Sequence, residues 1–567
     1  MSLETNSKAL KYLVAGYNAD WLLGDLSGLI HAGKERARDQ LGRLSSPMRQ
    51  LYYLAGLNVS SAPGEEDVGY SREKWGTMVT LLNQIENDYE ELFYSNPPGK
   101  LTEDWIRVRK VAVPSFLSYF NQGPLNFEEQ VINWVQDLFT PLDATIEIAT
   151  GVTTGEFLLF YQNLDGFRHT NFQAHAGQKR LLRPNWKKYT KIQMGVADEA
   201  PDFIKEMAEP MAPEFSWRTD QGMIDRFYPS ELVTKNLSIE KVNVILAQLR
   251  MKREPTDYLY YTGTRPGNPL IDRPILDIGG GMYQVFEVKQ VIHTIRDLLE
   301  TVCSQTKPDE AAYVKRKGKL LESRVLELFE QFFRSGYKAY KGYYVDGKEQ
   351  DILILWKKYA FIVETKGYSM REPFRNPEKA FVRIKDDFND SIGYGFEQSE
   401  RIATKFIEQM PLIMTDAHGL IVEEIDTSLY DEEFSIVVNM ESFGQVQCDL
   451  SAFIEPEEGH SYPWAVKLDD LEIFFLTMIA RKMDPTDLVD FLLFRETLHG
   501  KLICSDELEI CGGYLTGGLD QNKAEKADMV RTHASLGDVF DAQYHKSMGF
   551  KNEKYLYEKK IGKFLFW

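Results

Sequence analysis

The pattern of apolar and polar positions changes along the chain, and the change divides it into parts. Residues 1–255 have the pattern of a mostly helical region. Loops are expected there at Ser60–Asp67, Asn96–Lys100 and Lys252–Asp257. The pattern then becomes β-like, because three stretches alternate or are β-branched: Tyr258–Tyr261, Pro274–Ile278 and Tyr283–Lys289. A helix is expected next, over Val291–Val302.

The centre of the chain has the most informative order of elements. An amphipathic helix is predicted over Gly318–Arg334, with one apolar stripe formed by Leu321, Val325, Leu328, Phe329 and Phe332. The elements predicted after it are strands at Tyr340–Val345, Asp351–Leu355 and Ala360–Thr365, a helix at Glu397–Gln409 and a strand at Phe434–Asn439. Further helices are predicted at Leu468–Arg481 and Thr486–Leu498.

These patterns predict a multidomain α+β protein. A helical N-terminal region (1–255) and a connecting β-hairpin and helix (256–310) precede a central domain (311–440), and a mostly helical region (441–567) follows. The length of 567 residues supports several domains, since one hydrophobic core rarely organises so long a chain.

Charge is distributed unevenly between these parts of the chain. The net charge of −19 argues against a protein whose whole surface binds nucleic acid. Residues 311–410, however, contain 19 Lys and Arg against 15 Asp and Glu, a net charge of +4 that leaves −23 for the rest. The central segment is therefore the part best suited to contact a polyanion.

Several other classes of protein lack support in the sequence. It has no long apolar run and no N-terminal secretory pattern, so we expect a cytoplasmic protein that does not span a membrane. The cysteines, Cys303, Cys448, Cys504 and Cys511, are expected to be reduced thiols, because no CxxC pair suggests zinc. Among the dispersed histidines, the closest pair is His169 and His175, for which loop or core positions are expected.

The two central strands around Lys357 and Lys358 carry the candidate chemistry. If these lysines form a two-residue hairpin loop, the register places Asp351 opposite Glu364. Opposed side chains have Cβ atoms roughly 4.5–5.5 Å apart, so both carboxylates could share one cation. Strand alternation also puts Lys366 on the same face as Glu364.

This order of elements, α-β-β-β-α-β with D-x12-E-x-K, resembles the restriction-endonuclease-like, or PD-(D/E)xK, superfamily. Glu322, in the first turns of the preceding helix, looks like the additional helical acid of many members. Gln398, at the start of the helix after the lysine, resembles the helical glutamine of the RecB-like branches. Gln350 stands where the name of the superfamily has proline, and the resemblance covers residues 311–440.

The resemblance implies hydrolysis of phosphodiesters that depends on Mg²⁺ or Mn²⁺. Asp351, Glu364 and the carbonyl of Thr365 would hold the cation, and Glu322 would support a second one. Lys366 would orient the attacking water or stabilise charge on the phosphate, and Gln398 would position the nucleophile or a ligand. The basic residues expected to grip the nucleic-acid backbone are Lys315, Arg316, Lys317 and Lys319.

By the same resemblance, the expected substrate is double-stranded DNA, and the expected context is bacterial defence against foreign DNA. A partner ATPase, another defence subunit or a second copy of the chain could act with it, since the sequence has no GxxxxGK[ST] loop for phosphate binding. The alternative is an inactive, nuclease-like scaffold or nucleic-acid-binding subunit.

The segment from Asp277 to Lys289 offers a competing site and a competing function. Asp277, Glu287 and Lys289 also form D-x9-E-x-K across an expected hairpin that would oppose the two acids. Leu276–Gly281 resembles the glycine-rich motif of AdoMet-dependent methyltransferases, and Asn96-Pro97-Pro98 resembles their NPPY motif, which together would suggest a fused restriction-methyltransferase. We instead interpret Gly279–Gly281 as a hairpin turn and Asn96–Gly99 as the end of a helix.

Overall fold

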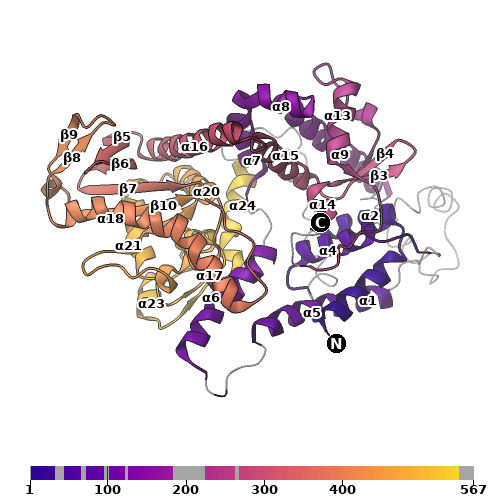
Figure 1. The fold of residues 1–567 in the computed structure, drawn as a ribbon, viewed down its shortest axis with the longest axis horizontal. Helices are drawn as coiled ribbons and strands as arrows, with labels where there is room; N and C mark the ends of the chain where they lie inside the picture. The colour runs from indigo at the N-terminus through magenta and orange to yellow at the C-terminus, as the bar shows by residue number, and fades with distance from the viewer. Residues whose placement is uncertain are drawn as a thin grey trace. The chain divides into compact units, whose positions relative to one another are not determined.

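The structure is a computed structural model that describes residues 2–31, 44–64, 72–94, 99, 101–121, 126–182, 224–261 and 267–547. It divides into two compact units (Figure 1). The first contains Met1–Tyr89 and Phe127–Glu310, and the second contains Glu90–Asn126 and Ala311–Trp567. None of the described helices is long and apolar enough to cross a membrane.

The first unit is mainly helical where the structure describes it. Its helices are α1 (Leu3–Ala15), α2 (Ala19–His31), α4 (Pro47–Val59), the greater part of α5 (Arg72–Tyr94), α7 (Glu128–Phe139), α8 (Asp143–Thr150), α9 (Thr154–Leu182), α13 (Ile239–Leu249), α14 (Pro269–Asp272) and α15 (Val288–Cys303). A small sheet has the order β1 (Arg226–Phe227), β4 (Met282–Val285), β3 (Ile275–Gly279), β2 (Arg250–Met251).

The expected strand at Tyr258–Tyr261 is wrong, because these residues lie in no strand. Their aromatic rings pack against α4 instead. The ring of Tyr53 contacts those of Tyr258 and Tyr261, and its hydroxyl donates to the Leu259 carbonyl at 2.7 Å. Here the aromatic spacing serves packing on a helix and not strand pairing.

The expected opposition of Asp277 and Glu287 is also wrong. Asp277 pairs with Tyr283 in the β3–β4 hairpin, whose turn Gly279–Gly281 has three positive φ angles. Glu287 lies beyond β4 and caps α15, accepting hydrogen bonds from the main-chain N–H groups of Lys289 and Gln290 at 2.8 Å. The glycines form the predicted turn, and the acids serve as a turn residue and a helix cap. The second methyltransferase-like stretch, Asn96–Pro98, lies outside the described residues.

The second unit is built on a seven-stranded mixed sheet. Its order is β11 (Trp464–Lys467), β10 (Glu432–Asn439), β7 (Tyr359–Lys366), β6 (Lys348–Trp356), β5 (Tyr337–Val345), β8 (Leu412–Thr415), β9 (Ile421–Ile425). Strands β5, β6 and β7 form an antiparallel meander, while β10 runs parallel to both β7 and β11. The three central strands and the later strand at Phe434–Asn439 are thus where the sequence predicts them.

Helices lie on both faces of this sheet (Figure 1). One face is covered by α18 (Tyr394–Ile407), which packs on β7 and β10. On the other face lies α16 (Lys307–Phe333). Its Phe329 ring contacts Phe475 of α20 (Leu468–Ala480), and its Phe333 ring contacts Phe361 of β7. Because α16 begins at Lys307, Glu322 lies in the middle of the helix and not in its first turns, which corrects the sequence interpretation.

The remaining helices complete the same unit. They include α6 (Glu103–Asn121), α17 (Pro377–Phe388), α19 (Gln445–Cys448), α20 (Leu468–Ala480), α21 (Pro485–Glu496), α22 (Glu507–Thr516), α23 (Gln521–Lys526) and α24 (Asp538–Ser547), with the small β12 (Leu502–Ile503) and β13 (Val530–Arg531) pair. The predicted C-terminal helices are confirmed at α20 and α21. Strand β11 was not predicted, and it places part of 441–567 in the central sheet.

Candidate active site

The β6–β7 hairpin has the predicted register. Trp356 pairs with Tyr359 across the turn, and Lys357 takes a left-handed conformation with φ of 51°. The ladder continues to Ile352 and Val363, so Asp351 and Glu364 are the next residues on the two strands. The turn therefore brings both acids to the same end of the hairpin.

Asp351 is fixed by its neighbours on β7. The main-chain N–H of Thr365 donates to Asp351 Oδ2 at 2.7 Å, and the Thr365 hydroxyl donates to the same oxygen at 2.9 Å. The main-chain N–H of Asp351 in turn donates to Glu364 Oε1 at 3.3 Å. These bonds hold the two carboxylates beside each other, and they give Thr365 a positioning contact that the sequence did not reveal.

Glu364 is fully buried, with a side chain that is 0% exposed. Lys366 Nζ donates to Glu364 Oε2 at 3.3 Å. Burial and, to a lesser extent, the charge of Asp351 raise the pKa of Glu364 to about 8, although Lys366 and the hydrogen bond from the Asp351 main chain oppose the shift. The ionised form of Glu364 is therefore disfavoured in this site, and Lys366 offsets that penalty only in part.

The N-terminal turn of α18 confines Lys366. Its Nζ lies 5.4 Å from the centre of the Tyr394 ring, and a Cβ on Gly395 would come within 3.2 Å of Lys366 Cε. Gln398 lies one turn later on the buried face of the same helix. Its Oε1 is buried and accepts no hydrogen bond from the described part of the chain.

Glu322 and the predicted basic residues all lie on α16. Glu322 is half-buried, and its pKa is raised first by burial and then by the charge of Asp351, while Lys341 Nζ lies 3.7 Å from its Oε2. Lys315, Lys319 and Glu322 follow one another at helical spacing along one face of α16. The other two predicted contacts, Arg316 and Lys317, are half-buried on the same helix, and Lys317 Nζ lies 5.8 Å from the Tyr313 ring.

The donor atoms suit a cation that prefers oxygen ligands. Two carboxylates lie together at Asp351 and Glu364, and both hydrogen bonds to Asp351 fall on one of its oxygens. No group of three or more His, Cys, Asp or Glu side chains poised to hold a metal ion occurs among the described residues. Glu322 therefore does not complete a three-carboxylate site with Asp351 and Glu364. A cation bound by these two acids would also need main-chain or water oxygens as ligands.

Two further neighbours were missed as part of the site by the sequence interpretation. Tyr343 and Gln350 pair across β5 and β6, and both are buried. The Tyr343 hydroxyl and both amide atoms of Gln350 have no hydrogen-bond partner among the residues described. Burial raises the pKa of Tyr343, and so do the charges of Glu364 and Asp351. The available indication was the polar side chain of Gln350 directly before Asp351.

An acid pair and a lysine lie at the end of a hairpin, in a mixed sheet between helices, an arrangement similar to the one that the PD-(D/E)xK resemblance implies. Residues 317–424 match the family model of the nuclease-related domain (NERD). The matched segment includes Glu322, Asp351, Glu364, Lys366 and Gln398. The centre of the chain is therefore a nuclease-related domain. Comparison with curated proteins and with solved structures found no match to this chain.

Proposed function

We propose that this chain is a nuclease that hydrolyses phosphodiester bonds of DNA internally, with Mg²⁺ or Mn²⁺ as cofactor. The observation that carries the proposal is the convergence of Asp351, Glu364 and Lys366, linked by contacts of 3.3 Å, inside the matched nuclease-related segment. A buried acid pair beside a lysine costs stability unless a ligand uses it, since buried charges require partners. Such a cost is typical of functional sites.

The proposed roles follow from the surroundings of each side chain. Asp351, Glu364 and the Thr365 carbonyl would hold the cation. A bound Mg²⁺ would polarise the phosphate and lower the pKa of a coordinated water. Lys366, held between Glu364 and Tyr394, would stabilise charge that develops on the phosphate or orient the attacking water. Gln398, whose Oε1 has no hydrogen-bond partner among the residues that the structure describes, would position the nucleophile or a ligand, and Glu322 would support a second cation.

The substrate assignment rests on the charge distribution. The exposed Lys315 and Lys319 lie on the same helix face as Glu322, in a segment that is basic within an acidic chain. We propose that they and the adjacent Arg316 and Lys317 contact the backbone of double-stranded DNA. We also propose a role in bacterial defence, with an ATPase or another subunit as partner. This part of the proposal rests on analogy with other proteins in which large accessory regions flank a nuclease domain.

Plasmid cleavage tests the proposal. Purified protein is incubated with supercoiled plasmid and Mg²⁺ or Mn²⁺, with and without a chelator, beside Glu364→Ala, Lys366→Ala and Glu287→Ala. We expect cation-dependent nicking that each of the first two variants slows by about 10²-fold or more, as for loss of a group that stabilises the transition state. Glu287→Ala, which removes a helix cap and a hydrogen bond from the Tyr52 hydroxyl within the first unit, is the matched control.

The other outcomes are equally informative. Cleavage lost only in Glu287→Ala would refute the assigned site. No cleavage of plasmid or of an RNA substrate by the wild type, with either cation, would favour the inactive scaffold over the nuclease.

A further inference from the structure

Three buried polar side chains lie near the acid pair. Tyr343 of β5 and Gln350 of β6 are 5% and 0% exposed, and Gln398 of α18 is 8% exposed. The Tyr343 hydroxyl, both amide atoms of Gln350 and Gln398 Oε1 find no hydrogen-bond partner in the described part of the chain. A buried polar atom without a partner costs stability, so three such side chains beside a candidate active site require a physical reason.

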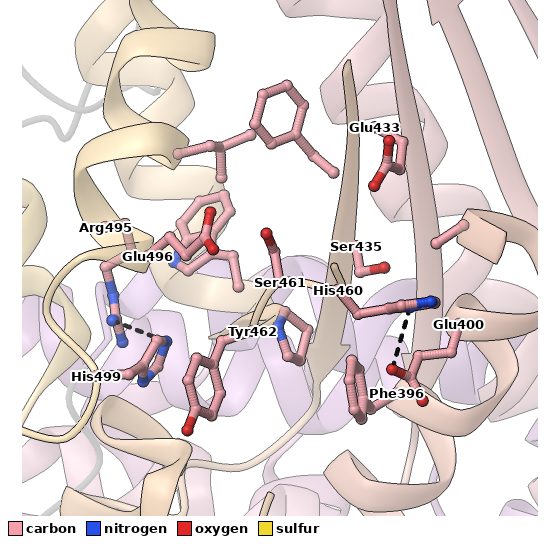
Figure 2. Close-up of a pocket in the computed structure, with 15 residues that line it drawn as sticks. Phe396, Glu400, Glu433, Ser435, His460, Ser461, Tyr462, Arg495, Glu496 and His499 are labelled. Carbon is pink, nitrogen blue, oxygen red and sulfur yellow. Dashed lines mark hydrogen bonds and ion pairs between the residues drawn. The ribbon is translucent and has the colours of Figure 1, made fainter. Parts of the chain in front are cut away.

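A pocket farther along α18, between this helix, β10 and α21, shows how other buried polar groups of the unit are arranged (Figure 2). There Glu400 Oε1 lies 3.4 Å from His460 Nδ1, and Arg495 Nη1 lies 3.3 Å from His499 Nε2. Arg495 is also paired with the buried Glu507. These groups therefore contact one another directly, in contrast to the polar atoms near the acid pair.

The hydroxyl of Tyr343 belongs to the same buried layer as Glu364. Tyr343 follows Gly342, which has φ of 61°, and it packs in the apolar cluster that contains Ile362. Glu364 lies two residues after Ile362 on β7 and therefore points to the same face of the sheet. Burial raises the pKa of Tyr343, and the charges of Glu364 and then Asp351 raise it further, as expected of near neighbours.

Gln350 lies between Tyr343 and the acids along the backbone. It pairs with Tyr343 across β5 and β6, so the two side chains share a face. It also directly precedes Asp351, whose main-chain N–H donates to Glu364 Oε1. An amide nitrogen can donate to a hydroxyl, and the hydroxyl can donate onward. Gln350 and Tyr343 are thus two neutral donors placed beside one carboxylate.

Glu364 has room to accept one of these donors. A carboxylate offers about four lone-pair positions, of which the Asp351 N–H and Lys366 Nζ use one each, both at 3.3 Å. A cation needs another, which leaves a position for a further donor. The contact with Lys366 is weakened by a cation on the same carboxylate, because like charges repel. A neutral hydroxyl can hold Glu364 in place of the lysine without adding charge.

We propose that Tyr343 is a positioning residue of the active site. Its hydroxyl donates to the Glu364 carboxylate when this acid holds the divalent cation, and the Gln350 amide donates to the hydroxyl. The inference rests on the proposed function, since it takes Glu364 as a cation ligand. Tyr343 contacts neither substrate nor cation and acts only by fixing the orientation of Glu364.

Removal of one hydroxyl tests the proposal on the full chain. Tyr343→Phe keeps the packed ring, and we expect the Mn²⁺ affinity, measured by calorimetric titration, to fall at least about 10-fold, as for loss of a hydrogen bond to a charged group. Without the cation, its unfolding temperature should equal or exceed that of the wild type, because a buried hydroxyl without a partner is removed. Tyr344→Phe is the matched control, since Tyr344 is half-buried and pairs with Glu349. It should keep the wild-type affinity.

A double variant shows whether Tyr343 acts through Glu364. In the Glu364→Gln background, which binds Mn²⁺ more weakly, adding Tyr343→Phe should change the affinity by less than about 2-fold, because the carboxylate that the hydroxyl orients is absent. An equal loss in both backgrounds, or a lower unfolding temperature of Tyr343→Phe, would indicate a structural role and overturn the inference.

The two proposals fail in different ways. Equal Mn²⁺ affinities of the wild type and Tyr343→Phe would overturn the positioning role and leave the proposed function standing. Absence of Mn²⁺ binding by the wild type would refute the proposed function, and the positioning role with it.

Discussion

At the scale of single residues, Asp351 depends on Thr365. The main-chain N–H of Thr365 fixes one carboxylate oxygen, and its hydroxyl donates a second hydrogen bond to the same atom. Hydrogen bonds to charged groups typically contribute about 1.5–3 kcal/mol. Of the two Thr365 donors that orient the Asp351 carboxylate, only the hydroxyl can be removed by a substitution that keeps the main-chain donor.

Replacing Thr365 by valine should therefore slow plasmid cleavage without changing the shape of the side chain at this position. Valine keeps the branched side chain and the main-chain donor but loses the hydroxyl, so we expect a decrease of about 10-fold or more in the single-turnover rate. Thr365→Ser, which keeps the hydroxyl, is expected to stay near the wild-type rate. Equal rates for the valine and serine variants would show that this bond does not position Asp351.

At the scale of elements, the hairpin was predictable and the approach of α18 was not. Two continuous apolar runs and the short polar turn between them predict the register that places Asp351 beside Glu364. The contact of Gly395 with the Val437 and Lys366 side chains joins residues distant in sequence, and no local pattern encodes it. The same reason explains the misjudged Glu287, whose role as a helix cap depends on where β4 ends.

The glycine at this contact gives a prediction for the helix. An added Cβ at Gly395 would lie 2.8 Å from Val437 Cγ1 and 3.2 Å from Lys366 Cε, so Gly395→Ala should displace α18 or the lysine. Overpacking of this kind typically costs about 1–3 kcal/mol, and we expect a lower unfolding temperature together with reduced cleavage.

A second glycine provides the control for this experiment. Gly318 lies within α16, and an added Cβ would meet nothing within 4 Å. Gly318→Ala should raise the free energy of unfolding by up to about 1 kcal/mol, as alanine favours helix. If both alanine variants were stabilised alike, α18 would not pack closely at Gly395.

At the scale of the molecule, the C-terminal helices and the nuclease-related sheet form part of one compact unit. Strand β11 extends the sheet beside β10, and Trp464 on β11 donates to Glu507 Oε1 at 2.8 Å. Glu507 is also the partner of the buried Arg495. The sequence predicted the helices, but the hydrophobic pattern did not show that a strand directly before them, β11, extends the central sheet.

Removal of this buried arginine should destabilise the sheet. Arg495→Met leaves the Glu507 carboxylate buried without its main partner, which typically costs about 3–5 kcal/mol. Denaturant unfolding followed by circular dichroism should show the loss, and Arg495→Met combined with Glu507→Gln should recover part of it. Exposed Lys523 offers a control, since Lys523→Met should change little. A loss in the free energy of unfolding below about 0.5 kcal/mol, typical of surface changes, would mean that the Arg495–Glu507 ion pair does not stabilise the packing of these elements.

The central claim is that Asp351 and Glu364 together hold a divalent cation beside Lys366. Electron paramagnetic resonance of Mn²⁺ measures this directly, because bound ions lose the signal of the free ion. We predict that the wild type and Lys366→Met bind Mn²⁺ and that Glu364→Gln binds it at least about 10-fold more weakly, since a charged ligand is lost. Equal Mn²⁺ binding by Glu364→Gln and the wild type would contradict the account.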